Sequence, residues 1–174
     1  ASADRPAIVF RNEADERDEV SWARLEAEVG ALAAWLRRQG VRPGDRVVAW
    51  LPNIPQTVTA FLAAASVGAV WSLCSPEMGV AAVADRFRQI EPKVLIAVDG
   101  YRWSGKAHDR REVLAEMVGQ LPTLERVVLL PHLDPTADPR ALPGGLSWSE
   151  ALSEPAPLQI DPLPFDHPLW VVYS

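Results

Sequence analysis

Short apolar runs of strand length alternate with helical segments along most of this 174-residue chain. Two consecutive strands can pair in parallel only if a crossover of about a dozen residues or more separates them, and a helix is the usual crossover. The sequence therefore predicts an α/β fold with a doubly wound, mostly parallel sheet and flanking helices. We predict the strands at 46–51, 70–73, 94–98 and 126–130, and the helices between them at about 56–66, 79–90 and 109–120.

The first forty residues predict a hairpin and one amphipathic helix. The hairpin spans about 7–20, and its tip at 13–19 is almost wholly charged. Ser21 can cap the helix that follows, and Gly40 can end it. Apolar residues recur along this helix at spacings of four, three and four, at Leu25, Val29, Leu32 and Leu36.

The last third of the chain is rich in proline. We predict that 131–168 is a long connection inside one domain rather than a second domain, with a short helical turn at Trp148. Residues 169–174 form an apolar strand with no cap or polar tail after it, and no initiator methionine precedes the first strand. We therefore expect a fragment of a longer protein.

Composition excludes several classes of function. The formal charge is −6 and no basic run is present, so we expect no nucleic-acid partner. Cys74 is the single cysteine, which rules out an intrachain disulfide and favours a cytoplasmic setting. The three histidines lack ligand spacing, so we expect no metal site and no cysteine nucleophile. The uncharged stretch 47–76 is interrupted by prolines, and we expect no membrane span and no signal peptide.

A glycine-lysine motif lies between the predicted strand at 94–98 and the predicted helix at 109–120. Gly100, Gly105 and Lys106 have the Walker A spacing of a small P-loop NTPase, but Ala107 stands where that motif needs a magnesium-binding hydroxyl. Three alternatives stay open. The motif is a chance surface loop, an anion-binding loop in which Lys106 near a helix start receives a ligand phosphate, or the true P-loop of a small NTPase.

Four strings in order carry a resemblance to a known family. They are "GVRPGDRVVAWLPN" from Gly40, "AFLAAASVGAVWSLCSPEMG" from Ala60, "DRFRQIEPKVLIAVDGYRWSGKAHDR" from Asp85 and "PFDHPLWVVYS" from Pro164. Together they resemble the adenylate-forming acyl-CoA synthetases over nearly the whole chain. One set of residues resembles the branch of that family that activates acetoacetate: Trp71, Cys74, Ser75, Pro76, Asp85, Arg86, Phe87 and the Gly105–Lys106 pair.

The resemblance implies an ATP-dependent acid–CoA ligase. Such an enzyme converts acetoacetate or a similar short-chain acid to its CoA thioester through an acyl adenylate, and its cofactors are ATP, Mg²⁺ and CoA. Residues 1–174 would be part of its N-terminal AMP-binding domain. The partners would be small molecules, and the fragment alone would be inactive because the family's catalytic motifs lie outside it. A non-catalytic flavodoxin-like binding module is the remaining alternative.

The resemblance also implies binding residues. CoA contacts are expected at Trp71, Ser72 and Leu73, where Ser72 and Leu73 stand in place of glycines of the related acetyl-CoA synthetases. Further CoA contacts are expected in the loop at 103–106, where Lys106 keeps a cation. Trp103 occupies an arginine position of the relatives, and Arg102 can substitute for that cation. Ser174 matches the first hydroxyl residue of the loop that grips the ATP phosphates. For the Trp71 side chain, core packing is the competing interpretation.

Overall fold

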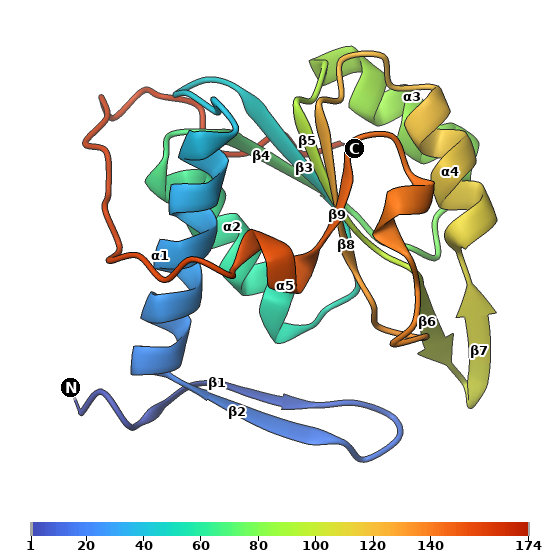
Figure 1. Ribbon diagram of the computed structural model, residues 1–174, viewed down its shortest axis with the longest axis horizontal. Coiled ribbons are helices and arrows are strands. Elements are labelled where there is room, and N and C mark those ends of the chain that lie inside the picture. Colours follow the sequence, from blue (N-terminus) through green and yellow to red (C-terminus); the bar gives the residue numbers. More distant parts are fainter. Residues whose placement is uncertain (1, 174) are drawn as a thin grey trace.

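A five-stranded parallel sheet forms the centre of the molecule in the computed structural model, which describes residues 2–173 (Figure 1). The strand order is β4-β3-β5-β8-β9, and every neighbouring pair is parallel. The sheet strands are β3 (Arg46–Trp50), β4 (Val70–Cys74), β5 (Val94–Val98), β8 (Arg126–Leu130) and β9 (Gly145–Ser147). The helices are α1 (Trp22–Arg38), α2 (Pro55–Ser66), α3 (Val80–Ile90), α4 (Arg111–Gly119) and α5 (Trp148–Ala151), with a 3₁₀ turn η1 (Pro139–Ala141).

The prediction of a doubly wound α/β fold is confirmed. In chain order the sheet strands run 2-1-3-4-5, so the winding direction reverses between β3 and β5. Ligands of such sheets bind beyond the carboxyl ends of the strands at this reversal. The topology therefore marks one edge of the sheet as the place for a site.

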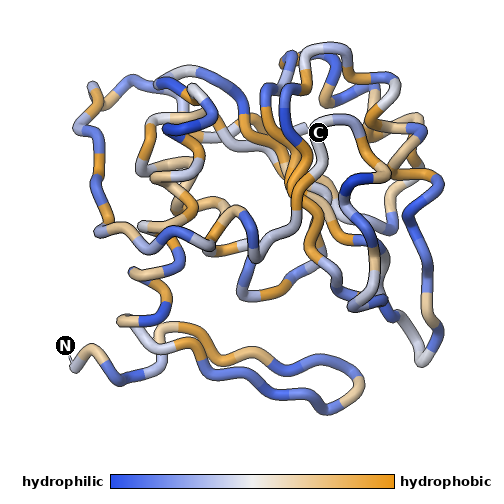
Figure 2. The backbone as a smooth tube through the Cα atoms, viewed as in Figure 1, coloured by the Kyte–Doolittle hydropathy of each residue, from blue (hydrophilic) through white to orange (hydrophobic). Residues whose placement is uncertain are grey.

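Two apolar cores lie on opposite faces of the sheet. Side chains alternate along each strand, so Val47 and Ala49 pack toward α1 and α2 while Val48 and Trp50 pack toward α3 and α4. The strand bundle is the most hydrophobic part of the chain (Figure 2). Burial on both faces explains why these strands read as continuous apolar runs in the sequence.

Two antiparallel hairpins stand apart from the central sheet (Figure 1). The first consists of β1 (Pro6–Arg11) and β2 (Arg17–Ser21), as the sequence predicted. It leads into α1, whose first turn is capped by Ser21: the hydroxyl oxygen accepts a hydrogen bond from the Arg24 amide at 3.1 Å. The second consists of β6 (Gly100–Trp103) and β7 (Lys106–Asp109), which the sequence did not predict.

The proline-rich stretch 131–168 contains short elements of secondary structure. It supplies β9, which pairs with β8, and α5, which begins at Trp148 and confirms the predicted helical turn. A Cβ atom added to Gly145 would lie 1.9 Å from the Pro139 carbonyl oxygen, so only glycine fits there. The stretch then crosses α1, where the Ala156 carbonyl lies so close to Gly30 that a Cβ atom would meet it at 2.4 Å.

The strand predicted at 169–174 is present as a single parallel bridge between Trp71 and Trp170. The Trp71 amide donates to the Leu169 carbonyl at 2.9 Å, and the Val171 amide donates to the Trp71 carbonyl at 2.8 Å. The chain thus begins a further parallel strand beside β4. Within residues 2–173, no helix is long and apolar enough to cross a bilayer.

Candidate functional site

A cavity of about 700 Å³ opens at the carboxyl edge of the sheet. The segments that follow β3, β4, β5 and β8 all contribute to its wall, and the β1–β2 hairpin contributes the remaining lining residues. This is the edge that the strand order marks for ligands. The lining includes Leu51–Ile54, Leu73, Ser75–Glu77, Tyr101–Trp103, His132, Leu133, and Phe10–Ala14 with Glu16.

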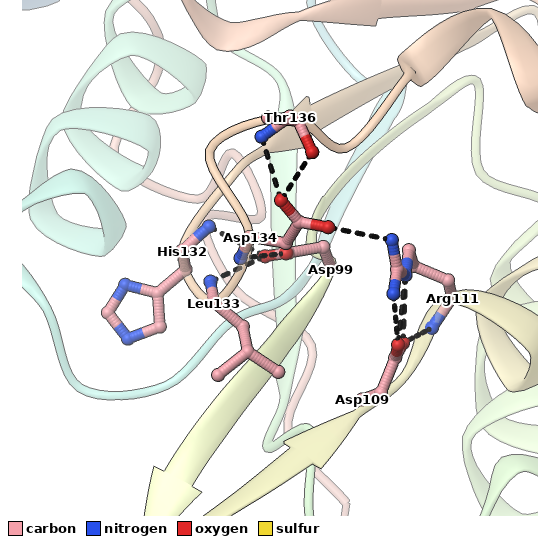
Figure 3. Close-up of polar contacts among 7 residues, drawn as sticks. All are labelled: Asp99, Asp109, Arg111, His132, Leu133, Asp134 and Thr136. Atoms are coloured by element: carbon pink, nitrogen blue, oxygen red, sulfur yellow. Dashed lines mark hydrogen bonds and ion pairs between the residues drawn. The ribbon is translucent and has the colours of Figure 1, made fainter.

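Asp99 fixes one wall of the cavity (Figure 3). Asp99 directly follows β5 and is 1% exposed, and its carboxylate accepts three hydrogen bonds from backbone amides. The amides of His132 and Leu133 donate to Oδ1 at 2.6 and 2.9 Å, and the amide of Asp134 donates to Oδ2 at 2.6 Å. One buried carboxylate therefore holds the loop after β8 against the end of β5.

The same loop is tied to α4 by an ion-pair chain (Figure 3). Arg111 pairs with Asp109 at the end of β7 and donates to Asp134 at 2.9 Å. Hydrogen bonds from Arg111 lower the pKa of Asp109, and hydrogen bonds from Thr136 lower the pKa of Asp134. These groups are solvent-exposed, so they align the hairpin and the loop more than they stabilise the fold.

An aromatic stack supports the cavity-lining residue Tyr101. The His108 ring lies 4.8 Å from the Tyr101 ring with an interplanar angle of 13°. The Arg110 guanidinium lies 5.4 Å from the centre of the same ring and donates to the Tyr101 hydroxyl at 3.2 Å. These contacts hold the Tyr101 side chain, on the part of the cavity lining that β6 supplies, without a contribution from the central sheet.

The charged groups of the cavity are unevenly paired. Arg11 pairs with Asp15, whereas the Arg102 side chain has no ion pair or hydrogen bond within residues 2–173. Partial burial lowers the pKa of the lining residue His132, an effect that the carboxylates of Asp99 and Glu16 oppose. Arg102 is therefore the cation of the lining best placed to accept an anionic ligand.

The Walker A interpretation of Gly100–Lys106 is wrong. These residues form the β6–β7 hairpin instead of a loop between a strand and a helix. Ser104 and Gly105 have φ values of 51° and 72°, which is the geometry of a tight hairpin turn. Lys106 begins β7, at the far end of that strand from α4, so the expectation that it lies near a helix start is also wrong.

Comparisons with known proteins decide the family. The model of the AMP-binding enzyme family matches residues 1–174. The chain belongs to the AMP-binding enzyme family. It is 39% identical to acetoacetyl-CoA synthetase of Xenopus tropicalis over 98% of this chain and 27% of that protein. The corresponding protein of Rhizobium meliloti is 40% identical over 97% of this chain and 26% of that protein.

A solved structure agrees with the family assignment. Acetoacetyl-CoA synthetase from Streptomyces lividans superposes with a TM-score of 0.94 at 50% identity, over 99% of this chain and 26% of that one. The resemblance to acyl-CoA synthetases found in the sequence is therefore confirmed. This chain spans about a quarter of the length of these relatives.

The binding residues expected from the AMP-binding family fall into three groups. Leu73 and Arg102 line the cavity. Trp71 is fully buried in the core on one face of the sheet, so core packing is confirmed for its side chain. Ser72 is also fully buried, and its hydroxyl donates to the Val171 carbonyl at 2.9 Å. Lys106 is exposed on β7 outside the lining, and Ser174 lies outside the described residues.

Sequence reasoning missed two residues that line the cavity, Glu13 and His132, and a third, Asp99, that anchors its wall. Asp99 follows a buried strand directly, which is a signal for a side chain at the carboxyl edge of the sheet. His132 lies two residues after the end of β8, at the same edge of the sheet. Glu13 lies in a charged hairpin tip and has no comparable signal. Within residues 2–173, no group of three or more histidine, cysteine or acidic side chains could hold a metal ion.

Cys74 at the end of β4 is predicted to be unreactive in the folded protein. It is 3% exposed, and burial raises the pKa of its thiol while the Arg86 guanidinium opposes that rise. Alkylation at neutral pH, followed by mass spectrometry of the peptide that contains Cys74, is expected to be about 100-fold slower or more in buffer than in urea. Because the folded-state pKa is raised, the buried thiol favours folding below the pKa of the unfolded state, and this contribution is lost as the pH rises through the folded-state pKa. Equal labelling rates in buffer and urea would show that the thiol is accessible.

Proposed function

We propose that this chain is part of the N-terminal domain of an ATP-dependent acid–CoA ligase that acts on acetoacetate or a similar short-chain acid. The observation that carries the proposal is the similarity of nearly the whole chain to acetoacetyl-CoA synthetases, which reaches 50% identity in the Streptomyces lividans protein. In this proposal 131–168 is a connection within the domain, the full protein is cytoplasmic, and its cofactors are ATP, Mg²⁺ and CoA.

The reaction needs activation of a carboxylate. A carboxylate resists nucleophiles because it is anionic and lacks a good leaving group. Attack of its oxygen on the α-phosphorus of ATP gives an acyl adenylate and releases pyrophosphate. The CoA thiol then attacks the acyl carbon, its proton is lost, and AMP leaves. Catalysis of both steps depends on positioning and on stabilisation of charge at phosphate.

The cavity is proposed to receive the nucleotide end of CoA. Arg102 supports this role, because its guanidinium has no partner within residues 2–173 and faces a cavity that can hold a ligand of several phosphate groups. Leu73 supplies an apolar wall, and Lys106 adds positive charge on the outer side of the same hairpin. Trp71 and Ser72, which are buried beside Leu73 on β4, are proposed to support CoA binding indirectly by fixing the position of that strand.

ATP is proposed to bind at the other part of the same sheet edge. The proposed contact of Ser174 with an ATP phosphate rests on the resemblance, in which Ser174 matches the first hydroxyl residue of the loop that binds the ATP phosphates. The described residues supply no acidic cluster for Mg²⁺, so the ATP phosphates and residues outside this chain are proposed to hold it.

The test is an assay of the full-length protein with acetoacetate, ATP and CoA. AMP and acetoacetyl-CoA are expected to form in equal amounts, and formation of either is expected to need all three substrates. Acetate and malonate serve as competing acids, and the 174-residue chain alone is expected to be inactive. Formation of ADP instead of AMP, or AMP formation independent of CoA, would contradict the proposed ligase.

A further inference from the structure

The β1–β2 and β6–β7 hairpins lie at the same end of the molecule (Figure 1), and the carboxylate of Glu13 joins their tips. Glu13 lies at the tip of the β1–β2 hairpin. Its Oε2 accepts a hydrogen bond from the Ser104 amide at 2.8 Å, and its Oε1 accepts one from the Gly105 amide at 3.0 Å. Within residues 2–173, no basic side chain forms an ion pair with Glu13. Backbone amides alone therefore hold this charge.

The two amides form a site for one oxyanion. Ser104 and Gly105 are consecutive residues with positive φ, so their N–H groups point outward from the turn toward the same carboxylate. Successive amides in such turns make concavities that bind anions. Glu13 thus occupies, from within the protein, a place that suits a phosphate group.

The contact also bridges the cavity. Glu13 belongs to its lining, as do Arg102 and Trp103 on the hairpin that it grips. Each hairpin is a separate two-stranded sheet, and isolated hairpins of this kind have little stability of their own. The separation of the two tips, and with it the access to the cavity, is therefore sensitive to this one carboxylate.

We propose that Glu13 is an exchangeable internal anion, which holds the two hairpins together until a phosphate group of CoA displaces it from the amides of Ser104 and Gly105. The inference rests on the proposed function, which places CoA in this cavity. A phosphate offers the same oxygen acceptors with more negative charge, and Arg102 and Lys106 flank the turn on either strand. The apparent dissociation constant for CoA then equals the intrinsic one divided by the fraction of molecules in which Glu13 has left the two amides.

The experiment compares Glu13→Gln and Glu13→Ala with the full-length wild-type protein. Both variants are expected to bind CoA about three- to tenfold more tightly by calorimetry, because the competing charge is gone. Their affinity for ATP is expected to stay unchanged. Glu19→Gln is the matched control, since Glu19 is an exposed glutamate of the same hairpin that pairs with Arg17 and lies outside the cavity lining.

Hydrogen exchange gives a second readout that is independent of activity. In the free wild-type protein, the amides of Ser104 and Gly105 are expected to exchange more slowly than in Glu13→Gln. With CoA bound to the wild type, these two amides are expected to stay protected while the released tip at 12–16 exchanges faster. This pattern separates displacement of Glu13 from a simple closing of the cavity around the ligand.

The outcomes distinguish the two proposals. If CoA binds the wild type but Glu13→Gln binds it no more tightly than Glu19→Gln, the exchange mechanism is wrong and the proposed function stands. A larger effect on ATP than on CoA would overturn the assignment of CoA as the displacing ligand. If CoA does not bind the wild type at all, the proposed function itself fails.

Discussion

Replacement of Asp99 by alanine is expected to lower the free energy of unfolding by about 3 kcal/mol, because three backbone amides at a buried position lose their acceptor. In Asp99→Asn one side-chain oxygen still accepts hydrogen bonds, but an NH₂ group replaces the other and faces a backbone N–H group. The free energy of unfolding of this variant is expected to fall by about half as much. Urea unfolding of the protein, followed by tryptophan fluorescence, measures the change. Hydrogen exchange of the amides of His132, Leu133 and Asp134 locates it.

Asp166→Ala is the matched control for this prediction. Asp166 is an exposed aspartate in the segment before the final bridge, so its loss is expected to change stability by less than about 0.5 kcal/mol. The anchoring role of Asp99 would be contradicted if the two variants were equally stable. It would also be contradicted if the amides of residues 132–134 kept their protection in Asp99→Ala.

Replacement of Arg102 by alanine is expected to raise the KM for CoA about 10- to 100-fold in the full-length enzyme, since a charge-assisted contact to phosphate contributes about 1.5–3 kcal/mol. The exchange of pyrophosphate into ATP with acetoacetate needs no CoA, so it is expected to proceed as in the wild type. Steady-state kinetics of both reactions give this split. Lys106→Ala is expected to act in the same direction with a smaller effect, because Lys106 lies outside the cavity lining.

Arg88→Ala provides the control for loss of a surface cation. Arg88 lies on α3, donates to Gln120 at 3.2 Å and does not line the cavity. The KM of the Arg88→Ala enzyme for CoA is therefore expected to match that of the wild type. An equal rise of KM in Arg88→Ala and Arg102→Ala would mean that general charge attracts CoA. An unchanged KM in Arg102→Ala would remove Arg102 from the proposed site.

The fold was largely predictable because local patterns dictate it. Apolar runs buried on both faces mark β3, β4, β5 and β8, and a capping serine with a regular apolar stripe marks α1. The strand β9 was missed, since it has only three residues directly before α5 and forms through its pairing with β8. Propensity carries little information about so short a strand.

The candidate site was predictable only in part. Leu73 and Arg102, which the resemblance implied as CoA contacts, line one cavity, and their contact with CoA stays a prediction. The Walker A spacing at Gly100–Lys106 has no functional counterpart, because the Ser104–Gly105 turn closes a hairpin there. Asp99 and Glu13 act through partners that lie more than 30 residues away in the sequence. Contacts between residues so far apart in the sequence depend on the tertiary fold, and a short sequence motif does not predict them.

The central claim is that the cavity at the carboxyl edge of the sheet receives CoA. Hydrogen exchange of the full-length protein with and without CoA tests it most directly. We predict slower exchange in the segments that line the cavity, at 51–54, 73–77, 101–103 and 132–133, with no change in α4 or β9. CoA binding that protects only regions outside these segments would contradict the account.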